Sequence, residues 1–278
     1  MRLRVFWDVD TQYDFMKKEG ALYVPDAELI RPNLKLLTDF AREKGIPIVG
    51  SVDRHFGNLE YKEREGELRR WGGPFPDHCM NHTAGQDKIW ETTLKRGSWG
   101  GKGEGDYNDC FFVYNPLTCK VTLEEVRRET REFIEKTQNP KFWEASEEEI
   151  KDMFILQTTG IDNQEIGMMV EEVKRVKIPG YLQRGVYFEK QTYNVFDNPN
   201  TGEFIKRAGI DEAVVYGVAT DFCVRAGTLE LQNRGVQCYV IEDAVKGVFP
   251  DTTQKALEEM VAAGAKLITT KDVLEGRI

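Results

Sequence analysis

The chain has 278 residues, of which 40% are hydrophobic, and its 38 lysines and arginines against 47 aspartates and glutamates give a net charge of −9. This composition is typical of a folded acidic protein and argues against nucleic acid or an anionic membrane surface as the partner. The sequence shows neither a secretory leader pattern nor a run of ~18 apolar residues, so we expect a cytoplasmic protein that acts on a small molecule.

Short, nearly continuous apolar runs predict strands that are buried on both faces of a sheet. In chain order these runs occupy residues 3–8, 47–52, 185–189, 213–218, 236–241 and 265–269. Amphipathic patterns, several of them closed by a glycine, predict helices at residues 28–44, 200–208, 224–234 and 252–263. The alternation predicts an α/β fold with a parallel sheet and a ligand site at the carboxyl ends of its strands.

Residues 96–177 interrupt this alternation. They begin with a glycine-rich stretch at residues 97–105 and continue with charged amphipathic patterns near residues 122–138, 146–156 and 163–174. The glycine-rich stretch lacks the Gly-Lys-Ser/Thr ending of a phosphate-binding loop, which favours a linker or a lid. We therefore expect one domain over residues 1–278 that carries a helical insertion at about residues 96–177.

Among the cysteines, Cys223 has a distinctive position, because it follows a predicted strand and begins a predicted helix. The five cysteines are irregularly spaced without a CxxC pair, which argues against a disulfide framework or a zinc finger. A helix N-terminus presents free N–H groups and a partial positive charge, which lower the pKa of a thiol and stabilise an oxyanion. From its position alone, Cys223 is either a nucleophile or a buried core residue.

Acidic and histidine side chains follow the first two predicted strands. Asp10 comes just after the first strand, where a carboxylate can accept the proton of a thiol and return it to a leaving amine. Asp53 and His55 follow the second strand, and their spacing lets both side chains face the same side. Together with His78 they form a mixed nitrogen and oxygen donor set that suits Zn or Fe.

Four motifs in a fixed order carry a family resemblance. They are Asp10-Thr-Gln-Tyr-Asp-Phe15, the pair Asp53-Arg-His55 and Pro76-Asp-His-Cys79, the pair Phe188-Glu-Lys190 and Tyr193-Asn-Val-Phe196, and Gly217-Val-Ala-Thr-Asp-Phe-Cys223. On these motifs the chain resembles the isochorismatase-like cysteine hydrolases, and most of all the nicotinamidases. The resemblance covers residues 1–90 and 187–278 and leaves the insertion unmatched.

The resemblance implies a three-layer α/β/α fold with a six-stranded, mainly parallel sheet and a catalytic triad of Asp10, Lys190 and Cys223. Lys190 alone would be interpreted as a solvated surface residue, but beside a thiol an ammonium group favours the thiolate. In the implied mechanism Cys223 attacks an amide carbon, Asp10 carries the proton to departing ammonia, and water hydrolyses the thioester. Backbone N–H groups of Ala219 and Cys223 would hold the oxyanion, with a cis peptide between Val218 and Ala219.

The resemblance also implies one divalent metal ion, Zn or Fe, on Asp53, His55 and His78. The loop between the histidines offers a fourth ligand, which we expect to be water or one of Glu60, Glu63, Glu65 and Glu67. Phe15 and Phe75 occupy the positions that would sandwich an aromatic substrate ring, although simple core packing also explains them.

The expected function is therefore the metal-assisted conversion of nicotinamide, or a close heteroaromatic amide, to nicotinate and ammonia. This reaction would place the protein in NAD salvage, and we expect a homo-oligomer. Three alternatives stay open: a metal-independent amidase for a ureido or aliphatic amide, a vinyl-ether hydrolase, and a non-catalytic protein that binds a partner through the insertion.

Overall fold

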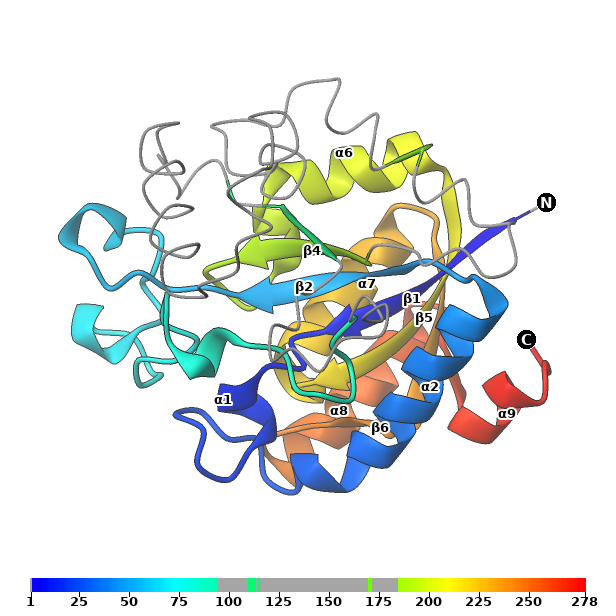
Figure 1. The fold of residues 1–278 in the computed structure, drawn as a ribbon, viewed down its shortest axis with the longest axis horizontal. Helices are drawn as coiled ribbons and strands as arrows, with labels where there is room; N and C mark the ends of the chain where they lie inside the picture. The colour runs from blue at the N-terminus through cyan, green and yellow to red at the C-terminus, as the bar shows by residue number, and fades with distance from the viewer. Residues whose placement is uncertain (1, 95–109, 114, 116–169, 172–184) are drawn as a thin grey trace, which may run out of the picture.

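The computed structural model describes residues 2–94, 110–113, 115, 170–171 and 185–278. Its centre is a parallel sheet, which in these residues has seven strands in the order β3-β4-β2-β1-β5-β6-β7 (Figure 1). The strands are β1 (Leu3–Val9), β2 (Ile48–Asp53), β3 (Cys110–Val113), β4 (Gly185–Lys190), β5 (Ile210–Val218), β6 (Gln237–Lys246) and β7 (Lys266–Ile268).

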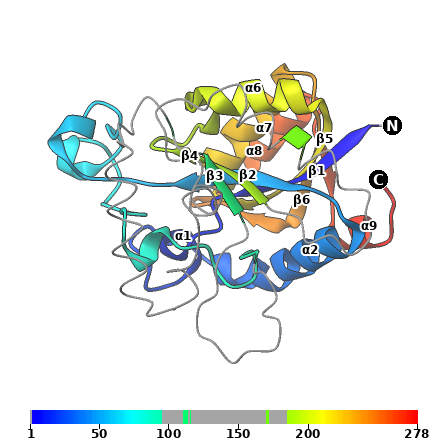
Figure 2. The same cartoon turned by 45° about the horizontal axis from the view of Figure 1, so that its top comes forward.

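Helices cover both faces of the sheet (Figure 2). One face is covered by α2 (Arg31–Lys44) and α9 (Thr270–Leu274), and the other by α6 (Pro199–Ala208), α7 (Arg225–Asn233) and α8 (Pro250–Ala262). The short helix α1 (Tyr13–Met16) follows β1. Short 3₁₀ turns lie at Ala27–Ile30, Leu59–Tyr61, Arg69–Trp71, Ala84–Gln86 and Val195–Asp197.

Alternate residues of the central strand β1 serve two separate hydrophobic cores. Val5, Trp7 and Val9 pack in the core beneath α6, α7 and α8, whereas Phe6 packs in the core beneath α2. A strand that buries both faces must be apolar at nearly every position, because successive side chains point to opposite sides. This requirement explains why continuous apolar runs predicted the strands.

The predicted three-layer α/β/α architecture with a parallel sheet is confirmed, and each of the six apolar runs forms a strand. The sheet carries one strand more than the expected six. This strand is β3, which pairs with β4 at the edge of the sheet and lies within the segment that we expected to be a helical insertion. Asn115 and Asn198 lie close to this edge, and the Asn198 side chain donates a 3.0 Å hydrogen bond to the carbonyl of Val113.

The predicted helices near residues 122–138 and 146–156 lie outside the described residues, as does the glycine-rich stretch at residues 97–105. Of the predicted helix near residues 163–174 only residues 170–171 are described, and both are helical. The interpretation of residues 96–177 as a helical insertion therefore stays a prediction. Within the described ranges, no helix combines the length and the apolar composition that a membrane span requires.

Four adjacent strands, β4, β2, β1 and β5, bring polar residues to one edge of the sheet. Lys190 and Asp53 are the last residues of β4 and β2, and Asp10 and Ala219 directly follow β1 and β5. Asp10 leaves β1 in the left-handed region with φ 48°, which turns the chain away from the strand direction. Parallel strands present all their carboxyl ends at the same edge, so residues far apart in the sequence meet there.

Candidate active site

The three side chains of the predicted triad lie together at this edge. Lys190 is buried at the end of β4, and its Nζ lies 2.9 Å from Asp10 Oδ2 and 3.5 Å from Cys223 Sγ. The other Asp10 oxygen, Oδ1, accepts a 2.7 Å hydrogen bond from Ser51 Oγ. A thiol, an ammonium group and a carboxylate therefore share contacts, which is the arrangement that an activated cysteine nucleophile needs.

Cys223 lies in a π-helical turn, Thr220–Val224, between β5 and α7. The strand leaves the sheet through Gly217, where φ is 116° and an added Cβ would lie 2.0 Å from the carbonyl oxygen of Val9. A side chain is therefore excluded at Gly217 both by backbone conformation and by space. The Val218–Ala219 peptide is cis, as predicted.

Asp221 ties the turn that carries Cys223 to α8. Its carboxylate accepts hydrogen bonds from the backbone N–H of Val248 at 2.9 Å and from Thr252 Oγ1 at 2.6 Å. These contacts hold the turn in place. Ala219 precedes this turn and Cys223 lies within it, and their role as oxyanion donors stays a prediction.

Burial and charge set the protonation of the triad. Burial raises the pKa of the Cys223 thiol well above its ordinary value, although the Lys190 ammonium opposes this. Burial also raises the pKa of Asp10 against the attraction of Lys190. Burial would lower the pKa of Lys190, but Asp10 and Asp53 outweigh it and raise that pKa well above its usual value. Asp10 is the carboxylate beside the thiol, and it can accept the thiol proton.

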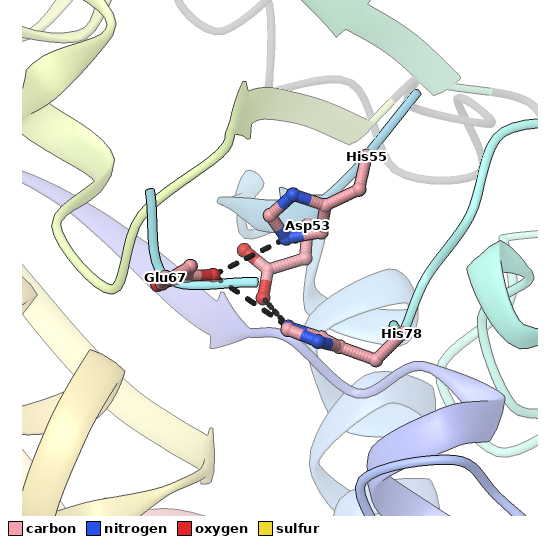
Figure 3. Close-up of side chains that lie close together, drawn as sticks. All are labelled: Asp53, His55, Glu67 and His78. Atoms are coloured by element: carbon pink, nitrogen blue, oxygen red, sulfur yellow. Dashed lines mark ion pairs between the residues drawn. The ribbon is translucent and has the colours of Figure 1, made fainter. Parts of the chain in front are cut away.

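The predicted metal ligands Asp53, His55 and His78 lie together beside the triad, joined by Glu67 (Figure 3). The four residues offer ligand atoms that all lie within 4.8 Å of one another. Glu67 Oε1 lies 3.2 Å from His55 Nε2 and 3.6 Å from His78 Nε2, and Asp53 Oδ2 lies 3.5 Å from His78 Nε2. Asp53 also forms an ion pair with Lys190, which joins this cluster to the triad.

The structure separates the four glutamates that the sequence left as equal candidates. Glu67 points into the cluster, whereas the Glu65 carboxylate accepts hydrogen bonds from the backbone N–H groups of Phe56 and Gly57. Glu60 and Glu63 are exposed. Glu67 is thus the member of this loop that is placed to act as the fourth ligand.

The electrostatics of the cluster favour a bound cation. Burial alone would lower the pKa of His78, but the contacts with Asp53 and Glu67 raise this pKa to about 10. Burial likewise opposes ionisation of Glu67, yet its contacts with His55 and His78 lower its pKa. His55 is fully buried, and its Nε2 faces Glu67 Oε1 at 3.2 Å. Two carboxylates and two imidazoles that face one another in a buried cluster fit a divalent metal that takes nitrogen and oxygen ligands.

Phe15 and Phe75 both flank the ring of His78. Their ring centroids lie 5.5 Å and 6.2 Å from that of His78, and Phe75 also contacts Phe222 edge to face at 5.7 Å. Phe15 is buried and Phe75 is half-buried. The two aromatic side chains that the sequence singled out therefore lie beside the cluster, and their contact with a substrate stays a prediction.

Two residues that position the site were missed in the sequence. Ser51 donates to Asp10, and the fully buried Gln12 holds the backbone of Asp53 through both ends of its amide. Gln12 Nε2 donates to the Asp53 carbonyl at 2.8 Å, and its Oε1 accepts from the Asp53 N–H at 2.6 Å. The available signals were the place of Ser51 as a polar residue in an apolar strand run and the place of Gln12 two residues after Asp10.

The family model of the isochorismatase domain matches residues 178–272. The nicotinamidase of Acinetobacter baylyi is 31% identical over 100 residues, which are 34% of this chain and 47% of that protein. The nicotinamidase/pyrazinamidase of Mycobacterium tuberculosis is 40% identical over 65 residues, which are 23% of this chain and 35% of that protein. The matched segments thus span less than half the length of these relatives.

Solved structures resemble this fold over nearly the whole chain. The pyrazinamidase of Pyrococcus horikoshii in complex with zinc gives a TM-score of 0.56 at 21% identity, covering 96% of this chain and 99% of that one. An isochorismatase-like hydrolase from Alkaliphilus metalliredigens gives 0.58 at 15% identity, covering 99% of each chain. At these identities the likeness shows a shared fold.

Proposed function

Starting from a chain that is isochorismatase-like and most resembles the nicotinamidases, we propose that it hydrolyses nicotinamide, or a close heteroaromatic amide, to the acid and ammonia. The contacts of Lys190 with both Asp10 and Cys223 are the observation that carries this proposal. They join a nucleophile, a proton acceptor and a fixed positive charge in one buried group.

Each member of the triad has one proposed role. Asp10 accepts the thiol proton, and Cys223 Sγ then attacks the amide carbon while backbone N–H groups of Ala219 and Cys223 hold the developing oxyanion. The C–N bond breaks as Asp10 gives that proton to the leaving nitrogen, so ammonia departs and a thioester remains. A water molecule that loses a proton to Asp10 hydrolyses the thioester and restores the thiol. Lys190 holds Asp10 in place and stabilises negative charge on sulfur.

Asp53, His55, Glu67 and His78 are the residues that would hold a divalent metal ion, with zinc and iron as the candidates. The ion would supply a Lewis acid that binds and orients a heteroaromatic nitrogen. Phe15 and Phe75, which both contact the ring of His78, would hold the substrate ring between them. Similar proteins support this interpretation, since they include nicotinamidases and a pyrazinamidase in complex with zinc.

Substitution of the nucleophile tests the chemistry. Purified Cys223→Ala is expected to release no ammonia from nicotinamide, because it removes the thiol that contacts Lys190. Cys238→Ala is the matched control, since Cys238 is a buried core thiol, and it is expected to keep turnover. Activity of Cys223→Ala near the wild-type rate would reject the thioester route and favour a vinyl-ether type of hydrolase.

A further inference from the structure

A second buried lysine lies close to the triad in contacts that the proposed reaction does not use. Lys88 is 8% exposed, and its Nζ lies 2.8 Å from Asp8 Oδ2 and 2.8 Å from Thr11 Oγ1. Asp8 is fully buried in β1, and it also accepts hydrogen bonds from Thr11 Oγ1 at 2.8 Å and from the Tyr187 hydroxyl at 3.1 Å. We refer to Asp8, Thr11 and Lys88 as the Lys88 cluster.

The Lys88 cluster lies at a core position where apolar side chains could pack equally well. Asp8 alternates with Trp7 and Val9 and so points to the same face of the sheet as Phe6, in the core beneath α2. Replacing a buried ion pair by apolar side chains of similar volume is often neutral or stabilising, because burying the charges is itself costly. Stability alone therefore gives little reason for a charged pair at this position.

The contacts of the cluster converge on the turn that presents Asp10. Asp10 has a positive φ of 48°, and Thr11, the next residue, is held by Asp8 and Lys88 through its hydroxyl. The backbone is held too, because the N–H of Ile89 donates to the Thr11 carbonyl at 2.9 Å. The segment that carries Lys88 thus holds both the side chain and the backbone of the residue that directly follows Asp10.

We propose that Lys88 is a positioning residue for the reaction. By pairing with Asp8 and fixing Thr11, it holds the left-handed turn that directs the Asp10 carboxylate toward Lys190 and Cys223. This inference rests on the proposed amide hydrolysis, in which Asp10 carries the proton. Small displacements of a group in that role reduce the rate of the chemical step far more than they change substrate binding.

The test compares Lys88→Met and the double variant Asp8→Val/Lys88→Met with the wild type. In both, kcat for nicotinamide is expected to fall about tenfold or more with little change in KM. Alkylation of Cys223 by iodoacetamide is expected to slow, as we also expect for Asp10→Asn, because the thiol proton loses its acceptor. Arg31→Met is the control, because it removes the Arg31–Glu91 ion pair of the same segment without touching Thr11.

A double variant that folds and keeps both kcat and the alkylation rate of the wild type would overturn the proposal, since the pair would then be merely structural. If neither lysine variant folds, Thr11→Val decides by the same two readouts, because it keeps both charges and the side-chain volume. Failure of the wild type to hydrolyse nicotinamide would reject the proposed function. The alkylation rates would still show whether Lys88 positions Asp10.

Discussion

Individual residues of the candidate site differ in how far the sequence could identify them. Asp10 was found because it is a polar residue just after a buried strand, and Cys223 because it lies between a predicted strand and a predicted helix. Parallel strands bring their carboxyl ends together, which explains why the two residues meet. Lys190 required the family resemblance, since the chain has 38 lysines and arginines and nothing local distinguishes one that is buried. Glu67 required the structure, because spacing along an irregular loop does not determine which carboxylate points inward.

Substitution of Glu67 tests the ligand set. Glu67→Gln is expected to weaken zinc or iron binding at least about tenfold, because it removes a charged ligand from a buried site. Metal content after dialysis against a metal buffer measures the effect. Glu63→Gln, which makes the same chemical change at an exposed position of the same loop, should bind like the wild type. Equal metal content in the two variants would remove Glu67 from the site.

The thiols offer a test that needs neither substrate nor metal. Burial raises the pKa of all of Cys79, Cys223 and Cys238, to about 12 for Cys238 and well above the ordinary value for the other two. Cys79 and Cys238 are fully buried, whereas Cys223 is half-buried and contacts Lys190, so iodoacetamide is expected to modify Cys223 before these two. Peptide mass spectrometry after short exposure of the folded protein measures the order. Earlier modification of Cys238 would contradict the placement of Cys223 at an accessible edge.

At the scale of elements, close pairing of strands places the site. Gly50 of β2 lies opposite Asp8 of β1, and an added Cβ at Gly50 would lie 1.9 Å from the carbonyl oxygen of Asp8. The sequence predicted both strands from their apolar runs, but it could not show this approach, which depends on register. It also missed β3, because the strand is short and lies in a segment dominated by helical patterns.

Gly50→Ala is expected to destabilise the protein by about 1–3 kcal/mol or more, because the two central strands must move apart. Thermal unfolding is the measurement, with a lower Tm as the expected result. Gly66→Ala is the control, since no atom lies within 4 Å of a Cβ added there. A Tm for Gly50→Ala equal to that of Gly66→Ala would show that β1 and β2 are not paired as described.

At the scale of the whole molecule, we expect a metal ion at this site to affect both the stability and the activity of the protein. Its ligands come from the end of β2 and from the loop that follows, so a bound ion would tie this loop to the sheet. An ion that binds only the folded chain raises the free energy of unfolding, by about 2.7 kcal/mol at 100 times its dissociation constant. We therefore expect zinc to raise the Tm of the wild type.

The same addition to Asp53→Asn/His78→Gln is expected to leave the Tm unchanged, since two of the four ligands are lost. Differential scanning calorimetry of metal-free protein, with and without zinc, measures both shifts. Equal stabilisation of the wild type and the double variant would place the bound ion elsewhere in the molecule.

The central measurement is ammonia release from nicotinamide by the purified protein, before chelation, after chelation and after readdition of zinc or iron. We predict turnover that disappears on chelation and returns with metal, because the cluster of Asp53, His55, Glu67 and His78 adjoins the triad. Full turnover that survives chelation would contradict the role given to the metal. Absence of turnover in metal-loaded protein, with larger amides hydrolysed instead, would contradict the choice of nicotinamide as substrate.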